Sequence, residues 1–307
     1  MKKPNNFLVG TGLALLATLL WSGNYIVARG LHQEITPITL AFLRWSTATL
    51  FLFPIAIRQI QKQKNLLISH LKFLCLAALL GVTLFNTFIY IAGKYSSAMN
   101  LAIIGTTAAP IFVLILASFF LKEKASISQI IGTIVCIVGI LLLISRGNFQ
   151  NLSHFKISLG DIWILFAALV FAFYTILVRK KPKDISSISF LFSIFLLGTL
   201  FLLPAFIFDN LQGQTFMWSL DLILIFLYLG IGASIGAFLS WNIAIQKIGS
   251  AKTALFGNLI PVFSTIEAVV ILKEENTWVN IISLVIILIG LLIANSNQLK
   301  KFLFNTN

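Results

Sequence analysis

Long apolar runs alternate with short polar stretches along the whole chain of 307 residues. A helix needs about 20 residues to cross the hydrocarbon layer of a bilayer, which is roughly 30 Å thick, and ten apolar stretches have about that length. The predicted membrane helices are residues 7–28, 37–57, 71–92, 97–120, 127–145, 158–178, 186–206, 220–243, 250–272 and 278–296. The stretches between them are mostly shorter than about 15 residues, as is usual between antiparallel neighbours in a helical bundle. The pattern therefore predicts an all-α membrane protein with ten transmembrane helices and no separate water-soluble domain.

The composition strengthens this prediction, because 59% of the residues are hydrophobic and only 10% are charged, against about 25% charged in a typical soluble domain. The net charge of +13 comes from short basic clusters between the apolar runs, and no basic stripe interleaved with aromatic residues indicates a nucleic-acid surface. With the N-terminus in the cytoplasm, sixteen of the 22 lysines and arginines fall on the cytoplasmic side and five on the other. Because positively charged loops stay inside, we expect both termini in the cytoplasm and the chain in the cell inner membrane.

The chain also repeats itself with an offset of 150 to 151 positions. The matching pairs are Gly10 and Gly160, Arg29 and Arg179, Ile35 and Ile185, Pro54 and Pro204, Pro110 and Pro261, Lys122-Glu123 and Lys273-Glu274, and Gly139 and Gly290. We predict a first five-helix repeat at 1–146, a second at 157–297 and a cytoplasmic tail at 298–307. Since each repeat has an odd number of spans, the second must be inverted relative to the first. Inverted repeats are typical of alternating-access transporters, whose substrate site lies near the bilayer midplane.

Four short motifs resemble those of a known family. They are Trp21-Ser22-Gly23-Asn24, Ala41-Phe42-Leu43-Arg44, and Pro110 and Pro261, each followed about a dozen residues later by a Lys-Glu pair. On these residues the chain resembles the EamA-type family of the drug/metabolite transporter superfamily. The resemblance implies a ten-helix inverted-repeat bundle around a central cavity, and the export or exchange of amino acids and related metabolites. The chain departs from the family pattern at Glu267, where the family more often has an apolar or small residue.

Several polar and aromatic residues recur at helical spacing, which keeps each set on one face of its helix. Trp21 and Asn24 are three positions apart, Asn86 and Tyr90 four, and Asn100 and Thr107 seven. An apolar cavity with a few hydrogen-bonding groups suits an amphipathic metabolite. The predicted cavity residues are Trp21, Asn24, Asn86, Tyr90, Asn100, Thr107, Trp241 and Asn258. The alternative is that they form the hydrogen bonds between helices, or the aromatic belts, that any membrane bundle contains.

Two charged residues fall inside predicted spans. A carboxylate at membrane depth costs at least ~2.5 kcal/mol and usually faces the bundle interior, so Glu267 is predicted to couple protons or to clamp a substrate amine, unless it reaches back to the surface. Arg44 begins about 10 Å deep, at 1.5 Å per residue. It pairs with Glu267, binds a substrate carboxylate, or has a structural role near the interface, where it snorkels or donates to backbone carbonyls.

Catalytic and metal chemistry find no support in the sequence. No nucleophile elbow, Walker A loop or paired-carboxylate pattern occurs; two separate cysteines and three isolated histidines make no metal site. We therefore expect no enzyme, no cofactor and no metal.

The leading hypothesis is a secondary active transporter of a small amphipathic metabolite, most simply an amino acid or derivative that is exported. Its partners would be that metabolite, the bilayer and protons. The alternatives are an exchanger or importer of a preformed metabolite, such as S-adenosylmethionine or a nucleotide derivative, and a non-transporting membrane scaffold. Gly230, Gly232 and Gly236 contain a GxxxG pattern, which predicts packing within a monomer or hinge-like freedom and, less simply, a weak homodimer.

Overall fold

The computed structural model describes residues 6–31, 35–95, 98–122, 126–145, 147, 159–212, 218–264, 266 and 278–304. Every regular element in these ranges is a helix. The elements are α1 (Asn6–Leu31), α2 (Pro37–Ser69), α3 (Leu71–Ala78), the π-helical η1 (Leu79–Leu84), α4 (Phe85–Tyr95), α5 (Ala98–Phe120), α6 (Ile127–Ser145), α8 (Leu159–Arg179), α9 (Ser187–Leu211), α10 (Leu220–Leu227), the π-helical η2 (Tyr228–Gly236), α11 (Ala237–Ile248), α12 (Ser250–Phe256), the 3-10 turn η3 (Gly257–Leu259) and α14 (Trp278–Phe304).

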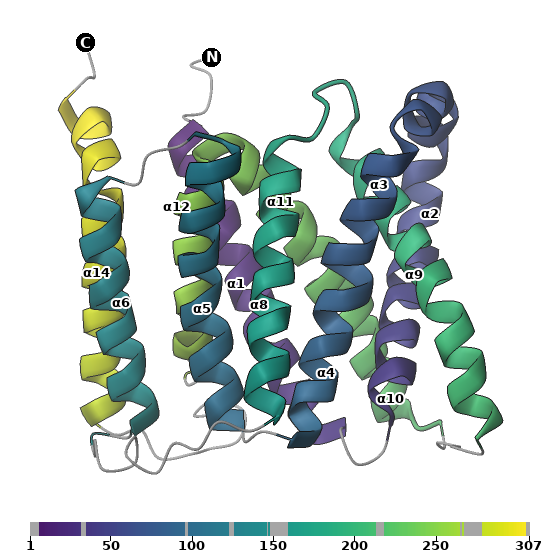
Figure 1. The fold of residues 1–307 in the computed structure, drawn as a ribbon, viewed down its shortest axis with the longest axis horizontal. Coiled ribbons are helices and arrows are strands. Elements are labelled where there is room, and N and C mark those ends of the chain that lie inside the picture. The colour runs from purple at the N-terminus through teal and green to yellow at the C-terminus, as the bar shows by residue number, and fades with distance from the viewer. Residues whose placement is uncertain are drawn as a thin grey trace.

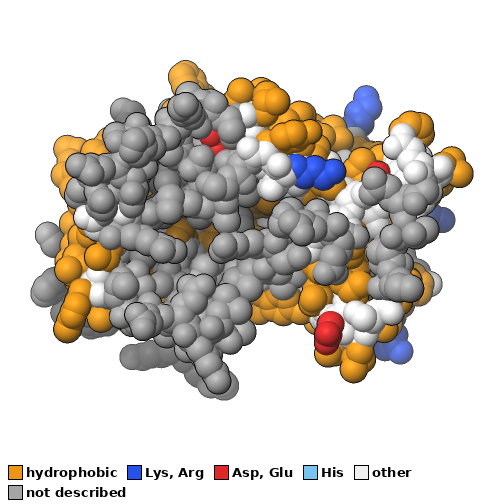
Figure 2. All heavy atoms as spheres, turned by 90° about the horizontal axis from the view of Figure 1, so that it is seen from below, with side chains coloured by type: hydrophobic (Ala, Val, Ile, Leu, Met, Phe, Trp, Pro, Cys, Tyr) orange, Lys and Arg blue, Asp and Glu red, His pale blue; other side chains and the backbone are white. Residues whose placement is uncertain are grey.

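The helices stand side by side in one bundle, with α6 and α14 at one edge and α2 and α9 at the other (Figure 1). The start of α1 and the end of α14 lie at the same end of the bundle. Large apolar side chains cover the outside, among them Leu50, Phe119 and Leu292, each more than half exposed. Figure 2 shows such hydrophobic side chains around the rim of the bundle. An apolar surface of this extent suits lipid rather than water.

Within the described residues, six helical segments are long and apolar enough to cross a membrane. They are Asn6–Gly23, Pro37–Ser69, Leu71–Tyr95, Leu159–Arg179, Ser187–Leu211 and Leu220–Ile248. Shorter apolar stretches lie at Ala108–Phe120, Ile127–Gly139 and Ile281–Ala294, inside three more of the predicted spans. The predicted all-helical, multi-pass architecture is confirmed. The count of ten spans and the cytoplasmic position of both termini stay predictions.

Helix α2 continues twelve residues beyond the predicted end of its span at residue 57. Thr36 caps its first turn by accepting a hydrogen bond from the Thr39 amide (3.1 Å), and Pro37 occupies the first helical position, where its missing N–H costs nothing. The extension is polar, so hydropathy alone could not include it. It is held by Gln63, which donates to the carbonyl of Asp184 (2.6 Å) between α8 and α9.

Helices α2 and α9 contact each other through residues that stand 150 positions apart. Thr49 and Thr199 share a hydrogen bond of 3.3 Å near the middle of the pair. At one end the α2 cap Thr36 donates to Asp209 of α9; at the other, the α9 cap Ser186 donates to Gln59 of α2 (2.6 Å). Thr36 matches Ser186, and Gln59 matches Asp209, at the same offset. A two-fold axis passing between the two helices would produce such reciprocal contacts.

The pair α6 and α14 is joined through glycines. A Cβ atom on Gly132 would lie 2.5 Å from the carbonyl oxygen of Gly290, and one on Gly290 would lie 2.6 Å from Sγ of Cys136. The thiol of Cys136 donates to the carbonyl of Ile287 at 3.5 Å, a residue 151 positions away. Small residues let membrane helices approach closely and gain dispersion contacts.

Gly230 lets η2 pack against α2 in the same way. A Cβ there would lie 2.6 Å from Thr47. A Cβ on Gly236 would lie 3.1 Å from Leu20 of α1. These glycines therefore pack within the chain, which is one of the roles that the sequence predicts for them; the homodimer stays a prediction.

Candidate functional site

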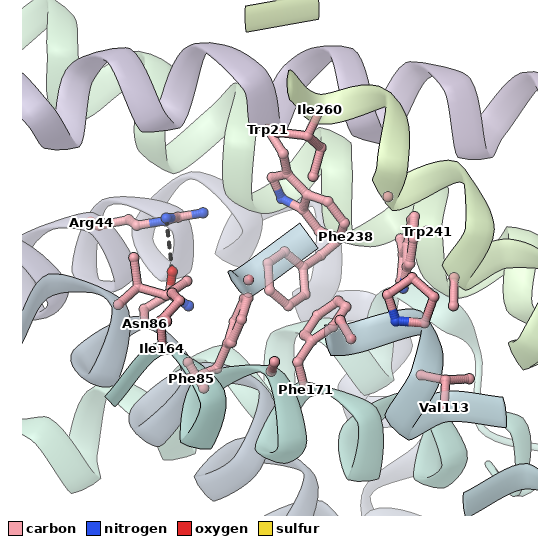
Figure 3. A pocket seen from close by; sticks show the side chains of 18 residues that line it. Trp21, Arg44, Phe85, Asn86, Val113, Ile164, Phe171, Phe238, Trp241 and Ile260 are labelled. Carbon is pink, nitrogen blue, oxygen red and sulfur yellow. Dashed lines mark hydrogen bonds between the residues drawn. The ribbon is translucent and has the colours of Figure 1, made fainter. Parts of the chain in front are cut away.

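A cavity lies inside the bundle, where helices of both halves of the chain meet (Figure 3). The centre of a water molecule can occupy about 70 Å³ of it. One water needs roughly 10–15 Å³ by this measure, so the cavity holds several waters or a small metabolite. Its wall comes from α1, α2, α4, α5, α8, α11 and α12, with Gly257 and Ile260 just beyond α12.

Five aromatic residues contribute rings to the wall. Trp21 of α1 packs against Trp241 of α11 with ring centroids 4.9 Å apart, and edge-on against Phe238 at 5.4 Å. Phe85 of α4 stacks on Phe171 of α8 at 4.4 Å. Interlocking rings of this kind keep their positions, because each has few rotatable bonds and several aromatic neighbours. The result is a stiff apolar cavity that shields a polar group on its wall from water.

Arg44 is the charged residue of this wall and is only 1% exposed. Its Nε donates to Ser234 Oγ (2.8 Å), Nη1 to Asn86 Oδ1 (3.0 Å) and to the Tyr90 hydroxyl (3.1 Å), and Nη2 to the carbonyl oxygen of Ala233 (3.1 Å). These bonds tie α2 to α4 and to η2. A buried charge is tolerated when its hydrogen bonds are satisfied in this way.

Ala233, whose carbonyl accepts from other helices, lies in the π-helical η2. A π-helix pairs residues five apart, and such turns often occur at functional sites. The Ala233 carbonyl takes hydrogen bonds from two side chains of the first half, Arg44 Nη2 and Trp21 Nε1 (2.9 Å). The second half thus anchors both groups at the cavity wall.

The structure brings four of the predicted site residues together at the cavity: Trp21, Arg44, Asn86 and Trp241. Tyr90 is not one of the lining residues, but its hydroxyl accepts a hydrogen bond from Arg44. Asn258 is buried, at 1% exposed, and adjoins Gly257, but it does not line the cavity. The backbones of Asn24, Asn100 and Thr107 lie in helices, whereas their side chains are outside the described part of the structure, and Glu267 is outside it altogether. Their functional roles stay predictions, as do those of the four lining residues.

The sequence analysis missed the apolar part of the wall and the acceptor carbonyl of Ala233. Phe171, Ile164 and Pro110 line the cavity, but no sequence signal separates a cavity-facing apolar residue from a lipid-facing one. For Arg44 the sequence left three roles, which are pairing with Glu267, binding a substrate carboxylate, and a structural role near the interface by snorkelling or bonding to carbonyls. In the structure it lies inside the bundle and donates to a carbonyl, among other groups. No group of three or more histidines, cysteines or acidic residues meets in the described residues.

A helical bundle with an apolar surface and an internal cavity on which polar groups are held by both halves of the chain has the architecture of a membrane transporter. The model of the EamA-like transporter family matches residues 8–145 and again residues 158–296. The chain belongs to this family and is a membrane transporter, which confirms the family resemblance noted in the sequence.

Relatives of known sequence agree. A protein of Archaeoglobus fulgidus described as an uncharacterized transporter is 28% identical over 93% of this chain and 97% of its own length. A probable amino-acid metabolite efflux pump of Salmonella typhimurium is 29% identical over 92% of this chain and 93% of its own. A solved crystal structure that is 16% identical superposes with a TM-score of 0.74, covering 95% of this chain and 96% of that one. That likeness supports the fold.

Proposed function

We propose that the protein is a secondary active transporter that exports a small amphipathic metabolite, an amino acid or a derivative of one, across the inner membrane. The observation that carries the proposal is the buried guanidinium of Arg44, fixed by Asn86 and Ser234 on the wall of an aromatic cavity. A fixed cation selects a carboxylate, and the rings accommodate an apolar body. The relative named as a probable amino-acid metabolite efflux pump supports the same substrate class.

Alternating access by two inverted repeats, 1–146 and 157–297, would expose this cavity to each side in turn. Both repeats contribute to its wall, Trp21 and Asn86 from the first and Phe171 and Trp241 from the second. The contact between Thr49 and Thr199 marks where the symmetry axis would pass. The sequence carries no ATP-binding motif, so a gradient or exchange would supply the energy, with Glu267 the candidate for proton coupling.

Counterflow in proteoliposomes tests the proposal. Vesicles preloaded with an unlabelled mixture of amino acids and their derivatives are expected to accumulate one or a few of these compounds transiently in radiolabelled form. Ile164→Trp should abolish this uptake, because the 1% exposed Ile164 lines the cavity and a larger ring fills it. The matched control is Ile162→Trp two residues earlier on α8, where the side chain is 42% exposed; its uptake should stay within about twofold of wild type.

The other outcomes decide between the alternatives. Exchange of S-adenosylmethionine or a nucleotide derivative, without amino acids, would replace the proposed substrate class. No exchange of any compound in a broad metabolite panel would favour a scaffold. Equal uptake by the Ile164→Trp and Ile162→Trp variants would remove the cavity as the transport site.

A further inference from the structure

Two hydrogen-bond donors on the cavity wall have no partner. Asn86 is 2% exposed, and its Oδ1 accepts a hydrogen bond from Arg44, which orients the amide and leaves its Nδ2 group unpaired. Trp241 is 1% exposed, and its indole Nε1 is also unpaired. Buried polar groups in proteins are almost always satisfied, so each exception calls for an explanation. Both residues line the cavity, so a ligand there can satisfy both.

The chemistry of these groups restricts the ligand. An amide nitrogen and an indole N–H donate and do not accept, and a guanidinium does the same. The other indole on the wall, that of Trp21, already donates to the Ala233 carbonyl. Among the described lining residues, the side-chain acceptor Asn86 Oδ1 already accepts from Arg44, and the side-chain groups left without a partner are donors. The positive charge of Arg44 would repel a ligand ammonium group.

The donors also lie apart. In Figure 3, Arg44 and Asn86 stand on one side of the cavity and Trp241 on the other, with the rings of Phe85, Phe171 and Phe238 between them. A matching ligand has two separate acceptors and an apolar group that packs against these rings. The end beside Arg44 suits an anion, because hydrogen bonds to a charged group are stronger than neutral ones.

Building on the transport function proposed above, we propose that the substrate is a carboxylate in which an uncharged acceptor replaces the free amine, as in an N-acyl amino acid. The carboxylate accepts from Asn86 Nδ2 beside Arg44. The acyl carbonyl accepts from Trp241 Nε1. The apolar side chain packs on Phe85 and Phe171.

Binding of matched compounds to purified protein tests this assignment. The probes are N-acetyl-L-leucine, with a carboxylate and an amide carbonyl; L-leucine, with a carboxylate and an ammonium; and 4-methylpentanoate, with a carboxylate alone. N-acetyl-L-phenylalanine and L-phenylalanine form a second pair. Calorimetry should show that each acetylated compound binds about tenfold or more tightly than its parent, since one well-placed hydrogen bond changes affinity by about that factor.

Two tryptophan variants distinguish the contribution of the Trp241 hydrogen bond to binding from that of its aromatic ring. Trp241→Phe keeps an aromatic wall and removes the N–H, so N-acetyl-L-leucine should then bind about as weakly as 4-methylpentanoate. The matched control is Trp45→Phe, because the indole N–H of Trp45 is also buried and unpaired but lies outside the cavity wall. The control should keep the preference of wild type. If Trp241→Phe does not fold, the preference of wild type alone decides.

Equal or tighter binding of L-leucine and L-phenylalanine by wild type would overturn the assignment, and so would an unchanged preference in folded Trp241→Phe. Counterflow with the same compounds distinguishes the two proposals. If the parent amino acids are transported but the acetylated compounds are not, the transport function is supported and the proposed class of substrate, the N-acyl amino acids, is wrong. Selective, Trp241-dependent binding without any counterflow supports the ligand assignment and contradicts transport.

Discussion

Replacing Arg44 with leucine is expected to reduce the initial rate of counterflow about a hundredfold while leaving a folded protein. The guanidinium supplies the charge among the described residues of the cavity wall and orients Asn86. Losing its attraction for a carboxylate, together with the hydrogen bond from the amide that it orients, amounts to about 3 kcal/mol. Stability should change less, because the variant loses bonds to Ser234 and Ala233 but also removes a buried charge that costs about 3 kcal/mol in a membrane helix. Counterflow rates and thermal unfolding followed by tryptophan fluorescence measure the two effects.

Arg179→Leu is the matched control. Arg179 also donates to backbone carbonyls, those of Ile245 (3.3 Å) and Gln246 (3.1 Å), but it lies at the end of α8 and does not line the cavity. This variant should keep counterflow within a few fold of wild type. Arg44→Lys should fall between the two, because an ammonium keeps the charge but lacks the planar fork that reaches both α4 and η2. Wild-type counterflow in Arg44→Leu would rule out the proposed role of the cavity.

Gly132→Ala is expected to have the largest effect on stability, lowering the free energy of unfolding by about 2–3 kcal/mol. The added methyl group would meet the backbone oxygen of Gly290 at 2.5 Å and the backbone nitrogen of Ala294 at 2.6 Å. Backbone atoms cannot turn away as a flexible side chain can, so α6 and α14 must move apart. Thermal or denaturant unfolding of purified protein in detergent measures the loss.

Gly12→Ala and Gly93→Ala are the controls, because nothing lies within 4 Å of a Cβ at either position. Alanine is the better helix former by roughly 1 kcal/mol, so these variants should be as stable as wild type or slightly more so. If Gly132→Ala unfolds at the same denaturant concentration as Gly12→Ala, the close packing of α6 on α14 is wrong.

The polar part of the candidate site could be predicted from the sequence because polar residues are rare inside apolar helices. Residues such as Arg44, Asn86 and Trp241 stand out because their spans are otherwise apolar. The spacing of four positions places Tyr90 on the same helix face as Asn86. The apolar part could not be predicted: Phe171 is one of 28 phenylalanines, and rings that face the cavity or the lipid lie in equally apolar surroundings. Hydropathy measures burial from water, which both positions share.

The sequence patterns also could not predict the π-helical segments. Hydropathy located the spans that contain η1 and η2, but it carries no signal for a π turn. The π-helical η2 contacts other helices, with Gly230 against Thr47 and the Ala233 carbonyl against Arg44. Such a turn changes the phase of every later residue in the span. The offset of 150 positions found in the sequence reappears in the contact between Thr49 and Thr199. The internal repeat could be found in the sequence because it extends over whole helices and does not depend on the direction of one side chain.

The most direct test of the central claim, that this cavity is the alternating-access substrate site, is its accessibility from the two sides of the membrane. Ala109 lines the cavity, so Ala109→Cys can be placed in a background from which Cys75 and Cys136, the free cysteines of the chain, have been removed. In sealed right-side-out and inside-out vesicles, a membrane-impermeant maleimide should modify this cysteine from both sides, and the transported compound should slow both reactions. Modification from one side alone, or at a rate that the compound does not change, would contradict the account.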